Sequence, residues 1–503
     1  MGGGNIVKKK VIVVGAGISG LTAGIYAQLS GFDAVIFESH TIPGGASTSW
    51  KRKGYTFEGG MHWLTGSSVK TPLNKLWREV GALDDSVSIY NRDPFFSYEY
   101  KGQTAYVYRD IDKLKNHFLS ISPEDKTEII RLCKDIKKFT KISMPVMDIK
   151  GVKVEEKARM PLSSIISMLP ALRRMSFYKG QRADEYADRF KSPVLKNLIK
   201  NIIGDESNAT GIVFTIATLA SGDGGYPEGG SLAMAARMAK RFEALGGKIE
   251  YGKAVSKVAV KDNKAYGVIV NGEIIPSDSV IVTQDTLVAI DKLFDNPIEE
   301  PWANRMRERI KPMLSTFISL GVEADLSDMP EMLTFSVDEP LLCAGIANYN
   351  IGFYNYADYK GYAPEGCTSI TSAIMGDTYD FWKSCKENGT YKEEKQKLAE
   401  TFISILSKKY PQIAGKVVVW DVATPLTYER YLHSYKGSWM SIMDDSSSMQ
   451  AYPSKPESIQ NVYFAGQRLV NPGGLPVALD TGRRAVQYLC RDTDMVFMGN
   501  KEI

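Results

Sequence analysis

Three glycines near the start of the chain have the spacing that binds a phosphate through backbone amides. Gly15, Gly17 and Gly20 form a G-x-G-x-x-G pattern in the segment VIVVGAGISGLTAG. In such a turn the first glycine allows a tight bend, the second lets a pyrophosphate approach the backbone, and the third lets the following helix pack against a sheet. The amides of Ile18 and Ser19, which open that helix, would add hydrogen-bond donors and a positive dipole. The pattern predicts a dinucleotide site.

The flanking residues predict the strand–helix–strand unit that positions this turn. Residues 10–14 are an apolar, β-branched run typical of a buried parallel strand, a helix is expected over 18–30, and a second strand over 33–38. Glu38 stands 18 residues after Gly20, close to the usual separation of about 20 for an acid that binds ribose hydroxyls. An arginine there would suit a 2′-phosphate, so NADP is disfavoured. The unit does not separate FAD from NAD.

Two glycine-rich segments that follow favour FAD. Residues 43–47 (PGGAS) offer free amides beside a phosphate and a ribityl chain. Residues 54–63 (GYTFEGGMHW) predict an extended segment that passes small residues under a flat ring, although a simple glycine-rich turn is the alternative. The candidate contacts in these segments are Gly44, Gly45, Ala46, Gly60, Met61 and His62.

The nucleotide-binding fold is expected to continue in two distant segments. Residues 225–283 predict a helix over 232–245 and strands over 248–260, 265–270 and 280–283, with Val255 either offering its backbone to adenine or serving as an ordinary buried valine. Near the end, residues 461–466 predict a strand and a helix begins at about Pro476. The amides and dipole of that helix could stabilise the anionic pyrimidine ring of a reduced flavin. These segments together predict FAD.

The motifs occur in an order that resembles a known family. The glycine unit, FEGGMH at 57–62, YPEGGS at 226–231 and YFAG…GGLPVALDTG at 463–482 are similar to the phytoene desaturase, carotenoid isomerase and retinol saturase branch of the FAD-dependent amine oxidase-like superfamily. The resemblance implies an α/β fold with a Rossmann-type, glutathione reductase-like FAD-binding domain, a discontinuous α+β substrate domain and a helical cap. It implies FAD contacts at Gly15, Gly17, Ile18, Ser19, Gly20, Glu38, Gly45, Ala46, Val255, Gly466, Leu475, Pro476 and Val477.

The sequence departs from the family pattern at two positions. Gln467 follows Gly466 where the family usually has an aspartate, so a hydrogen bond to the ribityl chain would be neutral or absent. Glu58 precedes Gly59 and Gly60 where relatives often have an aspartate before the glycine.

Composition limits the other classes of protein. The net charge of +4 among 503 residues is too small and too dispersed for a nucleic-acid-binding face. The five cysteines are odd in number and widely spaced, which predicts neither a disulfide framework nor a metal site and favours a reducing, cytoplasmic location. The glycine spacing argues against reading residues 11–29 as a signal peptide or membrane span, and no anchor is expected.

We expect an FAD-binding domain from residues 1–84, 225–284 and 456–503, with substrate-domain insertions at 85–224 and 285–455. The first insertion predicts strands over 95–100 and 105–108 and helical periodicity in 126–143 and 162–178. In residues 162–180, which include the last of these segments, apolar side chains stand beside Arg173, Arg174 and Lys179. It is either an internal cap helix with a solvated basic edge or a peripheral membrane contact that admits a lipid.

His62 is the candidate catalytic residue, because it is one of four histidines and lies in the loop expected beside the flavin ring. It could donate a proton to one carbon of a C=C bond while the flavin delivers hydride to the other. The alternative is structural, a histidine that is hydrogen-bonded to the backbone and shapes the loop.

The resemblance implies an FAD-dependent oxidoreductase that desaturates, saturates or isomerises a long lipophilic substrate such as a carotenoid, retinoid or fatty acid. No second G-x-G-x-x-G occurs in a strand–helix–strand setting, so a diffusible electron donor or acceptor is expected. One rival is a flavin amine oxidase, whose aromatic cage would need residues such as Tyr435 and Trp439. Another is a flavin-free escort protein of prenylated GTPases, although the intact 473–483 segment weighs against it.

Overall fold

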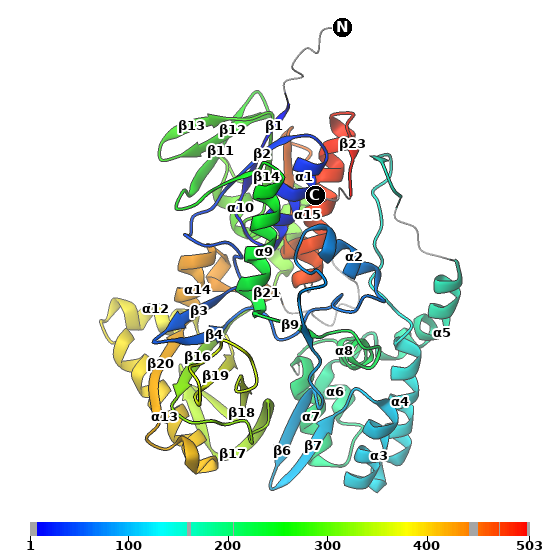
Figure 1. Ribbon diagram of the computed structural model, residues 1–503, viewed down its shortest axis with the longest axis vertical. Coiled ribbons are helices and arrows are strands. Elements are labelled where there is room, and N and C mark those ends of the chain that lie inside the picture. Colours follow the sequence, from blue (N-terminus) through cyan, green and yellow to red (C-terminus); the bar gives the residue numbers. More distant parts are fainter. Residues whose placement is uncertain (1–7, 158–161, 205, 442–450, 472, 500–503) are drawn as a thin grey trace.

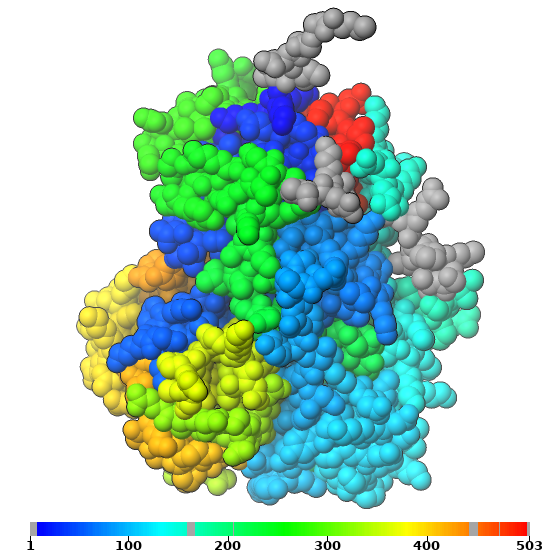
Figure 2. Space-filling model, in the orientation of Figure 1, coloured from blue at the N-terminus to red at the C-terminus, as the bar shows by residue number. Residues whose placement is uncertain are grey.

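The computed structural model describes residues 8–157, 162–204, 206–441, 451–471 and 473–499, with the side chains of the second range described from Ile166 onward. Figure 1 shows a nucleotide-binding lobe at the top, a large sheet flanked by helices at the lower left, and a group of helices at the lower right. In Figure 2 the upper lobe combines dark blue, green and red atoms, so segments far apart in the sequence pack together there.

The upper lobe is built on a parallel sheet of five strands in the order β10-β2-β1-β14-β22. Its apolar strands are flanked by helices, as in the predicted Rossmann-type fold. The strands are β1 (Lys10–Val14), β2 (Asp33–Phe37), β10 (Lys248–Glu250), β14 (Ser279–Val282) and β22 (Val462–Phe464), and the main helices are α1 (Ile18–Leu29), α9 (Gly230–Ala244) and α15 (Leu475–Asp492). Three separate stretches of sequence therefore form one nucleotide-binding sheet.

The single strand expected over 248–260 was wrong. β10 ends at Glu250, the chain turns through Gly252 at φ +67°, and a new strand, β11 (Val255–Lys261), begins a separate antiparallel sheet with β12 (Lys264–Val270) and β13 (Glu273–Pro276). The turn is held because the Lys253 amide donates to the Glu38 carbonyl at 2.8 Å. Apolar residues on both sides of the turn, such as Ile249, Tyr251 and Val255, hide it from pattern analysis.

The two insertions share a seven-stranded sheet in the order β20-β16-β19-β18-β17-β6-β7. The first insertion contributes the hairpin β6 (Phe96–Tyr100) and β7 (Gln103–Val107), and β6 pairs in parallel with β17. The other strands are β16 (Ser315–Val322), β17 (Met332–Cys343), β18 (Ile346–Asn355), β19 (Thr368–Met375) and β20 (Val417–Ala423), with α12 (Tyr379–Glu387) and α13 (Tyr391–Lys409) alongside. This sheet is the expected α+β part of the molecule.

The helical cap is formed by α3 (Ile111–Ile121), α4 (Lys126–Phe139), α5 (Leu162–Tyr178), α6 (Ala183–Ala187), α7 (Pro193–Ile203) and α8 (Thr210–Ala220). They share a core that includes Phe118, Leu132, Tyr178 and Leu195. Three apolar residues of α5 face outward instead, since Ile166, Leu169 and Leu172 are 58%, 43% and 44% exposed.

The remaining elements are short. They are β3 (Ser49–Arg52), β4 (Tyr55–Glu58), α2 (Pro72–Glu79), β5 (Ile89–Tyr90), β8 (Lys153–Val154), β9 (Tyr226–Pro227), α10 (Thr286–Lys292), α11 (Pro301–Arg309), β15 (Pro312–Met313), α14 (Pro425–Leu432), β21 (Met440–Ser441) and β23 (Val496–Phe497), with 3-10 turns at Pro123–Asp125, Pro411–Ile413, Tyr435–Gly437 and Gln467–Leu469. No helix within the described ranges is long and apolar enough to cross a membrane.

Candidate functional site

A cavity of about 1480 Å³ extends from the nucleotide-binding sheet to the seven-stranded sheet and the cap. Gly15, Glu38 and Gly466 line it on the nucleotide side, Phe353 comes from β18, and Asn197 comes from α7. Pockets for a single small molecule are typically about 300–1,000 Å³. The volume therefore suits a large cofactor and a substrate together.

Most residues predicted to contact the cofactor line this one cavity. They are Gly15, Gly17, Ile18, Ser19, Glu38, Gly44, Gly45, Ala46, Gly60, Met61, His62, Val255, Gly466, Leu475 and Pro476. Gly20 and Val477 do not line it. Gly20 acts in packing, because a Cβ there would lie 1.9 Å from the Gly15 carbonyl oxygen, whereas Val477 is buried in the first turn of α15.

Two helix N-termini open onto the cavity. The N-cap residues of α1 and α15 are Gly17 and Gly474, which have no side chain to cap the first turn, and neither helix has an acidic residue in that turn. The helices pack closely, since a Cβ on Gly482 would lie 2.5 Å from the Ser19 carbonyl oxygen. Uncapped amides and a positive dipole favour negative charge. The two termini fit a cofactor with a pyrophosphate and an anionic ring.

Other polar groups on the nucleotide side agree with this fit. Ser47 lines the cavity, and its buried hydroxyl has no hydrogen-bond partner among the described residues. Glu38 lies just beyond β2, where its carboxylate accepts the amides of Ala16 and His40, each at 2.7 Å, and the Ser39 hydroxyl at 3.2 Å. A carboxylate has about four acceptor positions, so one remains for a ribose hydroxyl.

Glu58 organises the loop that carries His62, a role that the sequence did not reveal. Its fully buried carboxylate accepts the amides of Gly60 at 2.9 Å and Met61 at 3.1 Å, and the hydroxyl of Tyr226 at 2.6 Å. It also accepts the Ser231 amide at 3.0 Å, near the start of α9. The departure noted at this position therefore links the cavity-lining loop at residues 59–62 to the start of α9.

His62 lines the cavity in a stack of aromatic and cationic groups. Its ring lies parallel to Tyr354, with centroids 4.1 Å apart and planes 6° apart, and the Arg92 guanidinium lies 5.2 Å from the Tyr354 centroid. Burial, and secondarily the charge of Arg92, lowers the pKa of His62 to about 4. The imidazole is therefore neutral near pH 7. The catalytic role expected for His62 stays a prediction, and a proton that it donates near pH 7 would come from a neutral ring.

The structural alternative for His62 expected a hydrogen bond from its ring to the backbone. Its buried Nδ1 has no hydrogen-bond partner among the described residues, so the ring is held by stacking and not by the backbone. Burial raises the pKa of the neighbouring Tyr354 to about 12, which keeps that phenol protonated. His62 and Tyr354 thus line the cavity as a stacked pair of uncharged side chains near pH 7.

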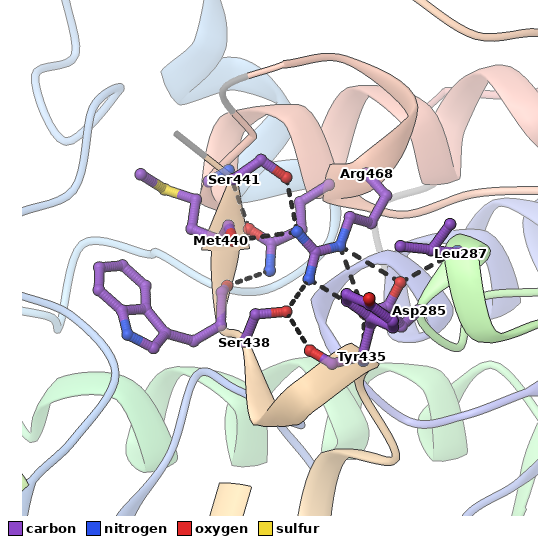
Figure 3. A network of polar contacts seen from close by, with 10 residues as sticks. Asp285, Leu287, Tyr435, Ser438, Met440, Ser441 and Arg468 are labelled. Carbon is purple, nitrogen blue, oxygen red and sulfur yellow. Dashed lines mark hydrogen bonds and ion pairs between the residues drawn. The ribbon is translucent and has the colours of Figure 1, made fainter. Parts of the chain in front are cut away.

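An ion pair that sequence reasoning missed fixes another wall of the cavity (Figure 3). Asp285 and Arg468 are nearly fully buried and their charged groups are 3.0 Å apart. Asp285 also accepts the amide of Leu287, at the start of α10, and that of Tyr435, each at 3.0 Å. Arg468 donates to the Met440 carbonyl at 2.9 Å and to the hydroxyls of Ser438 and Ser441. The network ties residues 435–441 to the nucleotide-binding sheet.

Comparisons with known proteins agree with this site. The model of a family described as "Flavin containing amine oxidoreductase" matches residues 18–490. The chain is 25% identical over 472 residues to a chloroplastic prolycopene isomerase of Daucus carota, which covers 90% of this chain and 75% of that protein. It is 21% identical over 510 residues to a lycopene-forming phytoene desaturase of Pseudescherichia vulneris, covering 96% and 99%.

Solved structures share the fold. A redesigned putrescine oxidase has a TM-score of 0.63 at 16% identity, with 96% of this chain and 99% of that chain covered. Cyclohexylamine oxidase of Brevibacterium oxydans has a TM-score of 0.61 at 14% identity, with 97% and 100% covered. FAD is the cofactor that the family and the cavity indicate in common. The chain belongs to the flavin containing amine oxidoreductase family.

Proposed function

We propose that this protein is an FAD-dependent oxidoreductase that acts on carbon–carbon double bonds of a long lipophilic substrate, such as a carotenoid, retinoid or fatty acid. The observation that carries the proposal is the single cavity, which joins the glycine turns to a chamber under the seven-stranded sheet. Curated relatives named as a prolycopene isomerase and phytoene desaturases support the substrate class. FAD supplies the hydride chemistry when bound.

The residues on the nucleotide side would hold FAD. We propose that Gly15, Gly17 and Ile18 meet the pyrophosphate, that Glu38 binds the ribose, and that the start of α15 faces the flavin ring. The other proposed contacts are Ser19, Gly20, Gly44, Gly45, Ala46, Gly60, Met61, His62, Val255, Gly466, Leu475, Pro476 and Val477. Support comes from the two glycine-capped helix N-termini without acidic residues in their first turns and from the unpartnered Ser47 hydroxyl.

The chamber beyond these residues suits a hydrophobic chain. Its apolar lining includes Phe96, Met332, Leu341, Ile351, Phe353 and Ile374. Polar residues such as Asn348 and Asn350 also line the cavity, but this apolar surface favours a long hydrocarbon over a small charged amine. His62 and Tyr354 stand where the nucleotide side meets this chamber, and we propose that they orient the substrate and do not carry a charge at neutral pH.

The kind of electron partner that we propose follows from the sequence motifs of the chain. Only one G-x-G-x-x-G stands between two strands, so we propose that electrons pass to or from a diffusible carrier. The same site then supports desaturation, saturation or isomerisation, and the carrier decides the direction.

We also propose that the protein touches a membrane surface through α5. An internal cap helix would bury its apolar residues, yet Ile166, Leu169 and Leu172 are exposed, next to exposed Arg173. An apolar stripe with basic neighbours is typical of a helix that lies in the lipid interface. Such a contact would supply a lipophilic substrate from a cytoplasmic leaflet.

The amine oxidase alternative has weaker support. Trp439 lines the cavity, but Tyr435 is 40% exposed and is not among the lining residues, so these two do not form the expected cage. The test is anaerobic incubation of the FAD-loaded protein with lipophilic polyenes and, separately, with primary amines. Polyenes are expected to change the oxidation state of the flavin or to leave as isomers, whereas flavin bleaching by amines alone would overturn the proposal.

A further inference from the structure

Gln467 is placed where the cofactor turn and the cavity wall come together. It lies on the 3-10 turn Gln467–Leu469, directly after β22, and lines the cavity. Its amide group Nε2 donates to the Trp439 carbonyl. The Trp439 ring also lines the cavity, and its Nε1 donates to the Ser315 hydroxyl at 3.1 Å.

The other end of the same side chain reaches the start of α15. Gln467 Oε1 accepts the Gly474 amide at 3.1 Å, and Gly474 is the residue before the first turn of that helix. The fit is close, because a Cβ added to Gly473 would lie 3.2 Å from Oε1 and 3.3 Å from the Gln467 Cβ. One side chain therefore spans two walls of the cavity.

A glutamine suits this position for a chemical reason. An amide offers a donor at one end and an acceptor at the other, whereas a carboxylate offers acceptors only. An aspartate or glutamate could still accept the Gly474 amide, but it would face the Trp439 carbonyl with no hydrogen to donate. The amide thus matches a backbone N–H on one side and a backbone C=O on the other.

We propose that Gln467 is a positioning residue that couples the cofactor turn at 473–474 to the cavity wall at residues 435–441. Cofactor bound at the start of α15 fixes the Gly474 amide, Gly474 fixes Gln467, and Gln467 holds Trp439. By linkage, whatever orders one end of this chain stabilises the other. The FAD-loaded protein therefore has a more rigid chamber wall than the FAD-free protein.

Hydrogen exchange on the full chain tests the coupling without any substrate. Peptides that cover residues 435–441 are followed in FAD-free and FAD-saturated protein for the wild type, Gln467→Glu and Gln467→Met. Gln412→Glu, at an exposed glutamine in the 3-10 turn Pro411–Ile413, is the charge-matched control. Flavin absorbance that co-elutes with each protein reports whether FAD is bound.

The proposal predicts that FAD slows exchange of 435–441 in the wild type and in the control. In both Gln467 variants that protection falls about fivefold, which corresponds to the net free-energy contribution of one hydrogen bond. Equal FAD-dependent protection in all four proteins, or none in the wild type, would overturn it. If neither Gln467 variant holds FAD, their FAD-free forms must exchange faster at 435–441 than the FAD-free control, and equal rates would also overturn it.

Discussion

Replacing Arg468 by methionine removes one half of the buried ion pair that holds residues 435–441. The side chains of Arg468 and Asp285 are 4% and 5% exposed, so the variant leaves the Asp285 carboxylate inside the protein without its cation. It also leaves the Met440 carbonyl and the hydroxyls of Ser438 and Ser441 without their donor. Breaking a buried pair from one side costs about 3–5 kcal/mol.

This free energy sets the expected shift in melting temperature. An unfolding entropy of about 2.1 cal/mol/K per residue over 503 residues is about 1 kcal/mol/K, so Arg468→Met should lower the Tm of the FAD-free protein by about 3–5 °C. Thermal unfolding followed by circular dichroism measures it. Arg52→Met is the control, because that arginine is 53% exposed in its ion pair with Asp421, and such surface pairs contribute about 0–1 kcal/mol.

A double variant separates the charge from the packing. Asp285→Asn combined with Arg468→Met removes the unpaired charge, while the asparagine side chain keeps an acceptor for the Leu287 amide. We expect the double variant to lose less stability than the two single variants added together. Strict additivity, or an Arg468→Met protein as stable as the Arg52→Met control, would refute the buried-pair reasoning.

Three further variants test other parts of the site. Gly20→Ala places a Cβ 1.9 Å from a backbone oxygen and should weaken FAD binding about 10- to 100-fold. Gly499→Ala is the control, because the nearest atom to its Cβ is 3.6 Å away, and it should bind FAD as the wild type does in the same titration. The pKa of His62 is about 4 in the folded protein and about 6.5 in the unfolded chain. The unfolded chain therefore binds the proton first as the pH falls. The free energy of unfolding decreases by up to about 3 kcal/mol as the pH drops from about 6.5 to about 4. His62→Gln should flatten the loss in denaturant titrations, and an unchanged slope would contradict the assigned burial. Leu169→Glu should weaken flotation with anionic lipid vesicles about tenfold or more. Leu342→Glu is the control, because Leu342 lies on β17 and is 62% exposed, and it should float as the wild type does. Equal flotation of the two variants would show that α5 does not contact the membrane.

The glycine turn and its flanking elements could be predicted because they depend on residues that are neighbours in the sequence. The spacing of Gly15, Gly17 and Gly20 fixes a turn, and the strand and helix around it followed at nearly the expected bounds. The joining of distant segments into one sheet was also predicted, because the patterns of residues 225–283 and 461–483 assigned both to the nucleotide-binding fold. The strand expected over 248–260 failed because its apolar pattern continues across the Gly252 turn.

The chemistry of individual side chains was harder to predict, because it depends on tertiary neighbours. His62 was found as a candidate, but its pKa follows from burial beside Tyr354 and Arg92, which come from different parts of the chain. Gln467 was noted only as a departure, and its partner Trp439 stands 28 residues earlier. Asp285 and Arg468 carry no motif, and only their 3.0 Å contact identifies them.

FAD in this cavity is proposed to act on carbon–carbon double bonds, and product analysis tests that chemistry most directly. The measurement is mass and isomer analysis of a carotenoid, a retinoid and an unsaturated fatty acid after anaerobic turnover with the FAD-loaded protein and a quinone or a chemical reductant. We predict that at least one of them gains or loses two hydrogens, or changes double-bond geometry at constant mass, and that protein without FAD is inactive. Unchanged polyenes beside a primary amine converted to its aldehyde would contradict the proposed function.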